Sequence, residues 1–225
     1  MMLSIDSSAK SAAVAVTDGN KLLAEGFENS GYTHSETLLP LVDATLKKAG
    51  KSIDDIDSFA VTNGPGSFTG LRIGCALVKG MACDKLCYPV PTLLALAYNC
   101  IDENAIVIPM MDARRCQTYT ATFRVKDGRV ERLSEDRAIA VAELEDEIIS
   151  HIKQRERVYV LGDGAYLLSE QTADLVVVPD DPLILGRSVA MAAQNILPVS
   201  ATELGLRYLR LSQAEREKQE KESLK

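Results

Sequence analysis

Two segments of the chain repeat one order of strands, turns and acidic residues, and this repeat constrains the fold more than any other feature. In the first, the strand "MMLSID" ends on Asp6, the apolar strand "AAVAVT" follows, and a turn at Asp18-Gly19-Asn20 leads into "KLLAEGF". In the second, "AIVIPMMD" ends on Asp112, "QTYTATFRV" alternates as a strand does, and a turn at Asp127-Gly128 leads into "RVERLS". Such turns between apolar runs are typical of β-hairpins. We therefore predict an internal structural duplication.

Helices and further strands are predicted behind each of these units. The helices fall at residues 35–49, 67–83, 92–100, 142–154 and 186–197, and the further strands at 57–63, 157–165 and 174–180. Antiparallel strands with an acid ending the first one and helices behind them are typical of the actin/Hsp70/sugar-kinase architecture, in which two α/β domains face a cleft. We predict this duplicated α/β fold, with a first domain at 1–102 and a smaller, degenerate second domain at 103–225 whose end can pack back on the first.

The composition narrows the classes of function. A formal net charge of −7 argues against nucleic-acid binding by this chain alone, which usually needs a basic surface. No apolar run reaches the roughly 18 to 20 residues of a membrane helix, and "MMLSID" has no basic region, so we expect a cytoplasmic protein without a signal peptide. The cysteines form no C-x-x-C pair and are expected to be reduced core residues. The two histidines, His34 and His151, are too far apart in the sequence to indicate a metal site.

The stretch "NGPGSFTGLRIG", residues 63–74, resembles a phosphate-binding loop that opens a helix, but it fails the spacing tests. A P-loop needs Lys and then Ser or Thr after its last glycine, where this chain has Leu71 and Arg72. A dinucleotide loop needs its third glycine one residue earlier than Gly70. Gly70 and Gly74 instead share one face of the helix, where the missing side chains let another backbone approach. We favour close packing of this helix over direct contact with a ligand.

The two strand-ending acids leave two interpretations open. Beside Asp6, Ser7 and Ser8 can donate to phosphate while the carboxylate holds a metal-bound water. Equally, the acid can close the strand end while the serines fill a tight turn. Asp112 is followed by two arginines, Arg114 and the next residue, which can bind phosphate. For this pair we favour pairing with surface acids.

The segment "HSETLLPLVDATLKKAG" has a wider apolar face than a surface helix normally shows. Its two stripes comprise Leu39, Val42, Leu46 and Ala49, and Leu38, Leu41 and Thr45. We infer that the helix is buried on two sides, against the core and against another protein. No Ser-His-Asp, Cys-His or paired-carboxylate arrangement with persuasive spacing is evident in the sequence, which argues against catalysis by this chain.

Taken together, these features resemble the bacterial TsaB (YeaZ) family of tRNA threonylcarbamoyladenosine biosynthesis proteins. The matching stretches are "SIDSSAKSAAVAV", "HSETLLPLVDATLKKAG", "VTNGPGSFTGLRIG", "MDARRCQTYTATF" and "YLRLSQAERE". The resemblance implies a non-catalytic paralogue of the catalytic subunit TsaD, which transfers a threonylcarbamoyl group from an adenylate to the adenosine beside the anticodon. TsaD uses a metal held by two histidines. Thr92 and Leu96 stand where those histidines would be, and neither side chain binds a metal well.

The resemblance also implies partners. In the family, the first two long helices pair with the equivalent helices of TsaD, and the ATPase TsaE joins that pair. Homodimers through the same surface are expected when TsaD is absent. Carried onto this chain, the helices at 35–49 and 67–83 form the interface, through His34, Leu38, Leu41, Val42, Thr45, Leu46, Leu71, Gly74, Cys75 and Val78.

These inferences lead to one principal hypothesis and one alternative. The principal hypothesis is a scaffold and activator of a tRNA-modifying complex, without direct tRNA contact and away from the membrane. No cofactor is expected to bind tightly, although ATP or ADP can bind at the junction of the complex, with Asp6, Ser7, Ser8 and Arg72 as the assigned contacts. The alternative is an enzyme, an ATP-dependent phosphotransferase or ATPase that uses both hairpins on its own.

Overall fold

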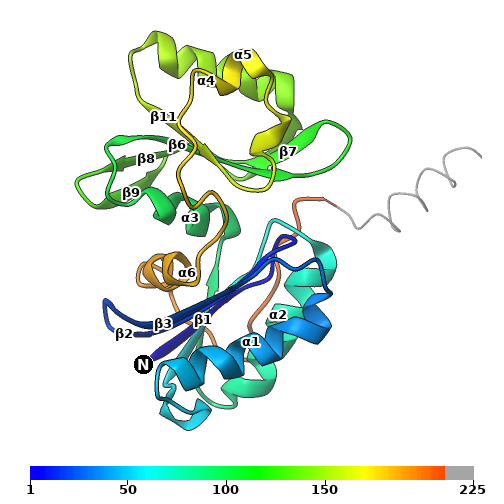
Figure 1. The fold of residues 1–225 in the computed structure, drawn as a ribbon, viewed down its shortest axis with the longest axis vertical. Helices are drawn as coiled ribbons and strands as arrows, with labels where there is room; N and C mark the ends of the chain where they lie inside the picture. The colour runs from blue at the N-terminus through cyan, green and yellow to red at the C-terminus, as the bar shows by residue number, and fades with distance from the viewer. Residues whose placement is uncertain (211–225) are drawn as a thin grey trace, which may run out of the picture.

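The structure is a computed structural model that describes residues 1–210 of the 225-residue chain. Its elements stack in alternating layers of helix and sheet (Figure 1). From the bottom of the view upward, the layers are α1 (His34–Lys48) with α2 (Phe68–Ala82), a first sheet, α3 (Thr92–Ala97) with α6 (Gly186–Ala193), a second sheet, and α4 (Val141–Lys153) with α5 (Glu170–Ala173). The segment from Ser212 to Lys225, whose mixed charge predicts a solvated helix or a frayed tail, lies outside the described residues.

The first sheet has the strand order β3-β2-β1-β4-β5. Its strands are β1 (Met2–Asp6), β2 (Ala12–Asp18), β3 (Lys21–Glu28), β4 (Ser58–Thr62) and β5 (Leu86–Val90). The first three pair in antiparallel fashion, and β4 and β5 continue parallel to β1. Gly19, with φ of 56°, occupies the predicted hairpin turn, because a left-handed backbone favours glycine. β1, β2 and β4 are buried almost throughout, since helices cover both faces of the sheet.

The second sheet is built around β6 (Ala105–Asp112). Its other strands are β7 (Gln117–Thr120), β8 (Phe123–Lys126), β9 (Arg129–Arg132), β10 (Arg137–Ala140) and β11 (Val158–Leu161). β7 and β8 both run antiparallel to β6 on one side, and β11 runs parallel to it. The single strand predicted for "QTYTATFRV" is therefore two strands. The break lies at Thr122, whose backbone bonds to Leu133 and Ser134 of the β9–β10 connection.

The two sheets repeat one order of strands, which confirms the predicted duplication and fold class. β6 corresponds to β1, and β11, which runs parallel to β6, corresponds to β4. The two short strands β7 and β8 together take the place of β2, and β10 and β9, which pair with them, take the place of β3. The equivalent of β5 is reduced to one parallel bridge between Val177 and Tyr159. The strand predicted at 174–180 is wrong, because Leu175 and Val178 on either side are more than half exposed and lack strand partners.

The end of the described chain returns to the first half. α6 packs against β1 and β2, and a side chain at Gly186 would lie 2.5 Å from the backbone of Val14, so the helix needs glycine at this point. Val199 forms an antiparallel bridge with Cys87 near the start of β5, and Leu204 is buried in the core of the first half. The second sheet begins at Ala105, and the boundary at residue 102 stays a prediction. α6 and residues 199–204 pack against the first sheet, and α6 also belongs to the core between the two sheets.

Two further sequence expectations concern cysteines and membrane helices. Cys75, Cys87 and Cys100 are buried and free, and burial raises the pKa of the Cys100 thiol to about 12. Cys83 and Cys116 are free but exposed, so the prediction of core cysteines holds for three of the five.

Within residues 1–210, no helix combines the length and apolar character needed to cross a membrane.

Candidate functional site

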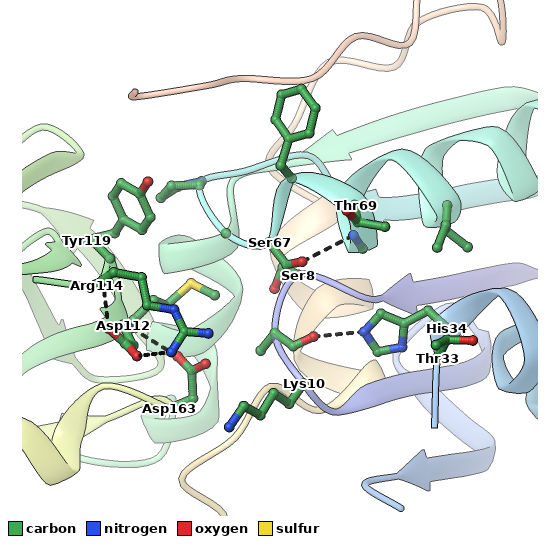
Figure 2. Close-up of a pocket in the computed structure, with 18 of the residues that line it drawn as sticks. Ser8, Lys10, Thr33, His34, Ser67, Thr69, Asp112, Arg114, Tyr119 and Asp163 are labelled. Atoms are coloured by element: carbon green, nitrogen blue, oxygen red, sulfur yellow. Dashed lines mark hydrogen bonds and ion pairs between the residues drawn. The ribbon is translucent and has the colours of Figure 1, made fainter. Parts of the chain in front are cut away.

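A cleft of about 1000 Å³ separates the two halves of the molecule. Five short segments line it: the β1–β2 turn, residues 29–35, the loop and first turn of α2, the β6–β7 turn with Asp163 and Tyr166, and residues 207–210. Figure 2 shows the first-half side chains Ser8, Lys10 and Ser67 facing Asp112, Arg114 and Asp163 of the second half. The cleft is therefore the place where the two repeated units meet.

Asp6 ends β1 beneath the cleft. Its Oδ1 accepts hydrogen bonds from the Thr62 hydroxyl at 2.6 Å and from the Ser8 backbone N–H at 3.1 Å. The carboxyl group is fully buried, and this desolvation raises its pKa despite those bonds. Its Oδ2 has no partner among the described residues. Asp6 thus fastens the β1–β2 turn to β4, which is the structural interpretation left open above.

The glycine face of α2 packs against this same turn. A Cβ at Gly70 would lie 2.0 Å from the Ser7 carbonyl oxygen, and one at Gly74 would lie 2.3 Å from Ser7 Oγ. The Ser7 hydroxyl donates to the Gly70 carbonyl at 2.9 Å, and the Ser67 N–H donates to the Ser8 carbonyl at 2.6 Å. The favoured interpretation, close helix packing, is confirmed. The neighbour is a turn of the same chain rather than another subunit, which corrects the assignment of Gly74 to an interface.

The four residues assigned to a nucleotide separate in the structure. Ser8 lines the cleft, and its buried hydroxyl has no partner among the described residues. Asp6 and Ser7 are buried beneath the turn. The Arg72 guanidinium lies 3.7 Å from the centre of the Phe68 ring, and Arg72 is not among the residues that line the cleft. Only Ser8 is in position to contact a ligand there, because the other three are engaged in packing.

The β6–β7 turn holds the second strand-ending acid. Asp112 accepts hydrogen bonds from the Arg114 N–H at 2.7 Å, from the Arg114 guanidinium at 3.1 Å and from the Tyr166 hydroxyl at 3.2 Å. The backbone is left-handed at three consecutive residues, Arg114, Arg115 and Cys116, with φ of 66°, 55° and 55°. This conformation is unfavourable for residues with a Cβ. For Arg114, the favoured pairing with an acid is confirmed.

Asp163 and Lys10 are cleft residues that the sequence analysis missed. Asp163 Oδ1 accepts a hydrogen bond from the Asp112 N–H at 3.2 Å, and Lys10 reaches toward it from the opposite wall (Figure 2). Burial raises the pKa of Asp163, the carboxylates of Asp112 and Asp6 raise it further, and Lys10 lowers it. The sequence signal that could have indicated Asp163 is the Gly-x-Gly turn after β11, because this turn places Asp163, between its two glycines, at the edge of the sheet.

The side chains assigned to a partner interface are mostly core residues. All but two of them are buried: Leu38, Val42, Thr45, Leu46, Leu71, Gly74, Cys75 and Val78. A side chain enclosed by its own chain cannot contact a partner in this conformation, so these residue assignments are corrected. Leu41 is half-buried, and His34 is half-buried with its Nε2 2.7 Å from the Ala9 carbonyl oxygen.

The outer face of α1 and α2 carries other apolar side chains. Ile73, Leu77 and Met81 are half-buried and follow one another at four-residue spacing along α2, so they form one stripe. On α1, the Leu39 side chain is 55% exposed. These residues, rather than the core positions, form the partly exposed apolar surface of the two helices, and Ile73 also lines the cleft.

Thr92 and Leu96 are both enclosed in the protein. Thr92 is fully buried, and its hydroxyl accepts a hydrogen bond from the Gly64 N–H at 3.2 Å. Leu96 belongs to the apolar core that α3 and α6 form between the sheets. Among residues 1–210, no group of three or more His, Cys, Asp and Glu side chains is arranged to hold a metal ion.

Comparison with known proteins gives consistent results. A family model described as TsaD, tRNA N6-adenosine threonylcarbamoyltransferase, matches residues 28–215. The tRNA threonylcarbamoyladenosine biosynthesis protein TsaB of Escherichia coli is 30% identical over 203 residues, covering 88% of this chain and 85% of that protein. Its namesake in Bacillus subtilis is 29% identical over 178 residues, covering 78% and 76%.

Solved structures agree at the level of the fold. YeaZ from Pseudomonas aeruginosa superimposes with a TM-score of 0.73 at 20% sequence identity, covering 92% of this chain and 99% of that one. At this identity the likeness establishes the fold alone. The matched length shows that both halves, and not one domain only, are shared.

Proposed function

Because the chain belongs to the TsaB (YeaZ) family of tRNA threonylcarbamoyladenosine biosynthesis proteins, we propose that it is a non-catalytic subunit of the complex that makes this modification. In this role it binds and activates TsaD and recruits the ATPase TsaE, in the cytoplasm. It does not itself contact tRNA, in keeping with its net charge of −7.

The observation that carries the proposal is the state of the two strand-ending acids. Asp6 is fully buried under hydrogen bonds from Thr62 and Ser8, and Asp112 is occupied by Arg114 and Tyr166. Asp6 is not among the residues that line the cleft, and Asp112, which does line it, is held by Arg114 and Tyr166. Neither carboxylate is therefore placed to orient a metal-bound water there, which an ATPase of this fold would need. Thr92 and Leu96 are enclosed, so the region corresponding to TsaD's metal site supports the core here.

The partner surface is the outer face of α1 and α2. It carries Leu39 and the stripe Ile73, Leu77 and Met81, and an apolar helix face of this kind fits a second pair of helices. The same face can pair two copies of this chain when TsaD is absent. The proposed partner surface therefore lies on the same two helices that the sequence indicated, but it consists of other side chains on them.

No cofactor is held tightly in this role. If ATP or ADP binds, it does so at the junction of the complex, where the cleft offers the cations Lys10 and Arg114 and the Ser8 hydroxyl, which has no partner within residues 1–210. The alternative, an independent ATPase or phosphotransferase, is disfavoured by the engaged acids. ATP turnover by the isolated chain would contradict the proposal.

A matched pair of leucines tests the partner surface. Leu39 on α1 and Leu175 in the second half are both 55% exposed, so Leu39→Glu and Leu175→Glu introduce the same charge at the same exposure. We expect Leu39→Glu to weaken binding of TsaD at least tenfold in titration calorimetry, because it places a charge in an apolar contact. Leu175→Glu should bind as the unchanged chain does. Equal affinities for the two variants would refute this surface.

A further inference from the structure

Residues 204–210 leave the core of the first half and run along the mouth of the cleft. Leu204 is buried, and the Arg207 N–H donates to the Asn63 carbonyl at 2.7 Å. Gly64, with φ of 121°, makes room for this segment, since a Cβ there would lie 2.1 Å from the Arg207 carbonyl oxygen. One glycine of the loop before α2 is therefore required by the chain that crosses it.

The same segment is stacked on α2. The ring of Tyr208 lies 4.7 Å from that of Phe68, centre to centre, and its hydroxyl accepts a hydrogen bond from Arg72 Nε at 3.1 Å. The Arg72 guanidinium covers the other ring at 3.7 Å. Arg72 is exposed and Tyr208 is 43% exposed, so the stack lies at the surface, next to Ile73 of the outer face.

The segment then reaches the second half. The Arg210 guanidinium donates to the Ala113 carbonyl at 3.2 Å, within the left-handed β6–β7 turn. Tyr208, Leu209 and Arg210 also line the cleft. One short stretch thus contacts three parts of the molecule: the glycine loop, the exposed side of α2, and the opposite wall of the cleft.

We propose that Leu204–Arg210 is a strap that holds the two halves at a fixed opening and transmits the docking of a protein on α2 to the cleft. The transmission rests on the function proposed above. A partner that covers Ile73 also meets Arg72 and Tyr208, and any shift of that stack moves Arg210 relative to the β6–β7 turn. A single hydrogen bond across the cleft is weak, so its loss changes the balance of closed and open forms by about fivefold.

The strap can be tested by measuring the separation of the halves. Cys83 is exposed at the end of α2, and Glu170 is exposed on α5, so spin labels at Cys83 and at Glu170→Cys report the opening by pulsed electron resonance. Cys116→Ser removes the other exposed thiol. Arg210→Ala removes the bond across the cleft. Arg207→Ala is the matched control, because Arg207 is fastened through its backbone N–H.

We expect one narrow distance distribution for the unchanged chain and for Arg207→Ala, and a second, longer population for Arg210→Ala. Adding TsaD should shift the distribution of the unchanged chain, and Arg210→Ala should lose that shift. Identical distributions for Arg210→Ala and Arg207→Ala would overturn the strap. If TsaD fails to co-elute with the unchanged chain, the proposed function and the transmission are both wrong, while the distributions without TsaD still decide whether the strap holds the halves.

Discussion

The β1–β2 turn and the β6–β7 turn occupy equivalent places in the two halves but differ in almost every physical respect. In the first, Ser7 and Ser8 are small and buried, Ser7 lies under the glycine face of α2, and Lys10 is exposed to the cleft. The second is exposed, carries two arginines, and adopts a left-handed backbone at three consecutive residues. Both follow a strand that ends in aspartate.

The difference shows that equivalent turns of a duplicated unit can take on different roles. The first turn is fixed by packing, so Asp6 and Ser7 serve the stability of the first half, while Ser8 and Lys10 line the cleft. The second turn is held by polar contacts at the surface, and one of its carbonyls receives Arg210 from the strap. Equivalent position therefore does not imply equivalent role, and three measurements test this contrast.

The largest effect is expected where a side chain is forced between α2 and the first turn. Gly74→Leu places a Cβ 2.3 Å from Ser7 Oγ, and we expect it to lower the free energy of unfolding by about 3 kcal/mol or more. Gly80→Leu is the control on the same helix, because nothing lies within 4 Å of a Cβ there, and it should raise stability by up to about 1 kcal/mol. Urea denaturation measures both.

Similar losses at the two glycines would contradict the close packing. Leu38 and Gly74 were both assigned to the partner interface from the sequence. Because both positions are buried, Leu38→Glu and Gly74→Leu would each weaken the fold itself, so a loss of partner binding in these variants would not identify an interface.

A smaller effect distinguishes the two strand-ending acids. Asp6→Ala leaves the Thr62 hydroxyl and the Ser8 N–H without their buried acceptor, which should cost about 2 kcal/mol. Asp112→Ala should cost under about 1 kcal/mol, because its charged partner Arg114 is 73% exposed and screened by water. Chemical denaturation at neutral pH compares them. Equal costs would mean that the two turns are held alike.

The smallest effect is a dependence on pH. Burial raises the pKa of Asp6 above its ordinary 3.8, so its contribution to stability is present below about pH 3.8 and is lost as the pH rises through the folded-state value. Asp6→Asn keeps an acceptor at Oδ1 and cannot ionise. We therefore expect its stability, relative to the unchanged chain, to improve as the pH rises from about 3.8.

Asp163 also has a raised pKa, to which the Asp6 carboxylate contributes, so the comparison is made between chains that also carry Asp163→Asn. A difference that does not change with pH would show that burial does not disfavour the Asp6 carboxylate.

The sequence predicts the fold well because strands, hairpin turns and helices leave local signals. The turn at Gly19, the helices α1, α2 and α4, and the duplication all follow from patterns within a few residues. The division of "QTYTATFRV" at Thr122 could not be predicted, because it depends on hydrogen bonds from residues 133 and 134. The sequence at 174–180 is apolar, as in a strand, yet within this segment Val177 alone forms a β-bridge in the described structure.

The site is less predictable than the fold. Apolar width suggested that α1 is buried on two sides, but it could not show that Leu38, Val42 and Leu46 all face the core of the same chain. The cleft brings Lys10 near Asp163, which is distant in sequence. The strap could not be predicted from the sequence, because its contacts join residues that are distant in the chain. Tyr208 contacts Phe68 and Arg72, and Arg210 contacts Ala113.

The return of α6 to the first sheet has a consequence for synthesis on the ribosome. The first sheet is translated early, yet the helix that covers its inner face and the buried Leu204 come only after the whole second sheet. Until then, the nascent chain exposes the inner face of β1 and β2 to solvent, where other chains and chaperones can bind it. The first half is thus the first to be made and the last to be completed, and a chain stopped before Gly186 leaves the ribosome with that face uncovered.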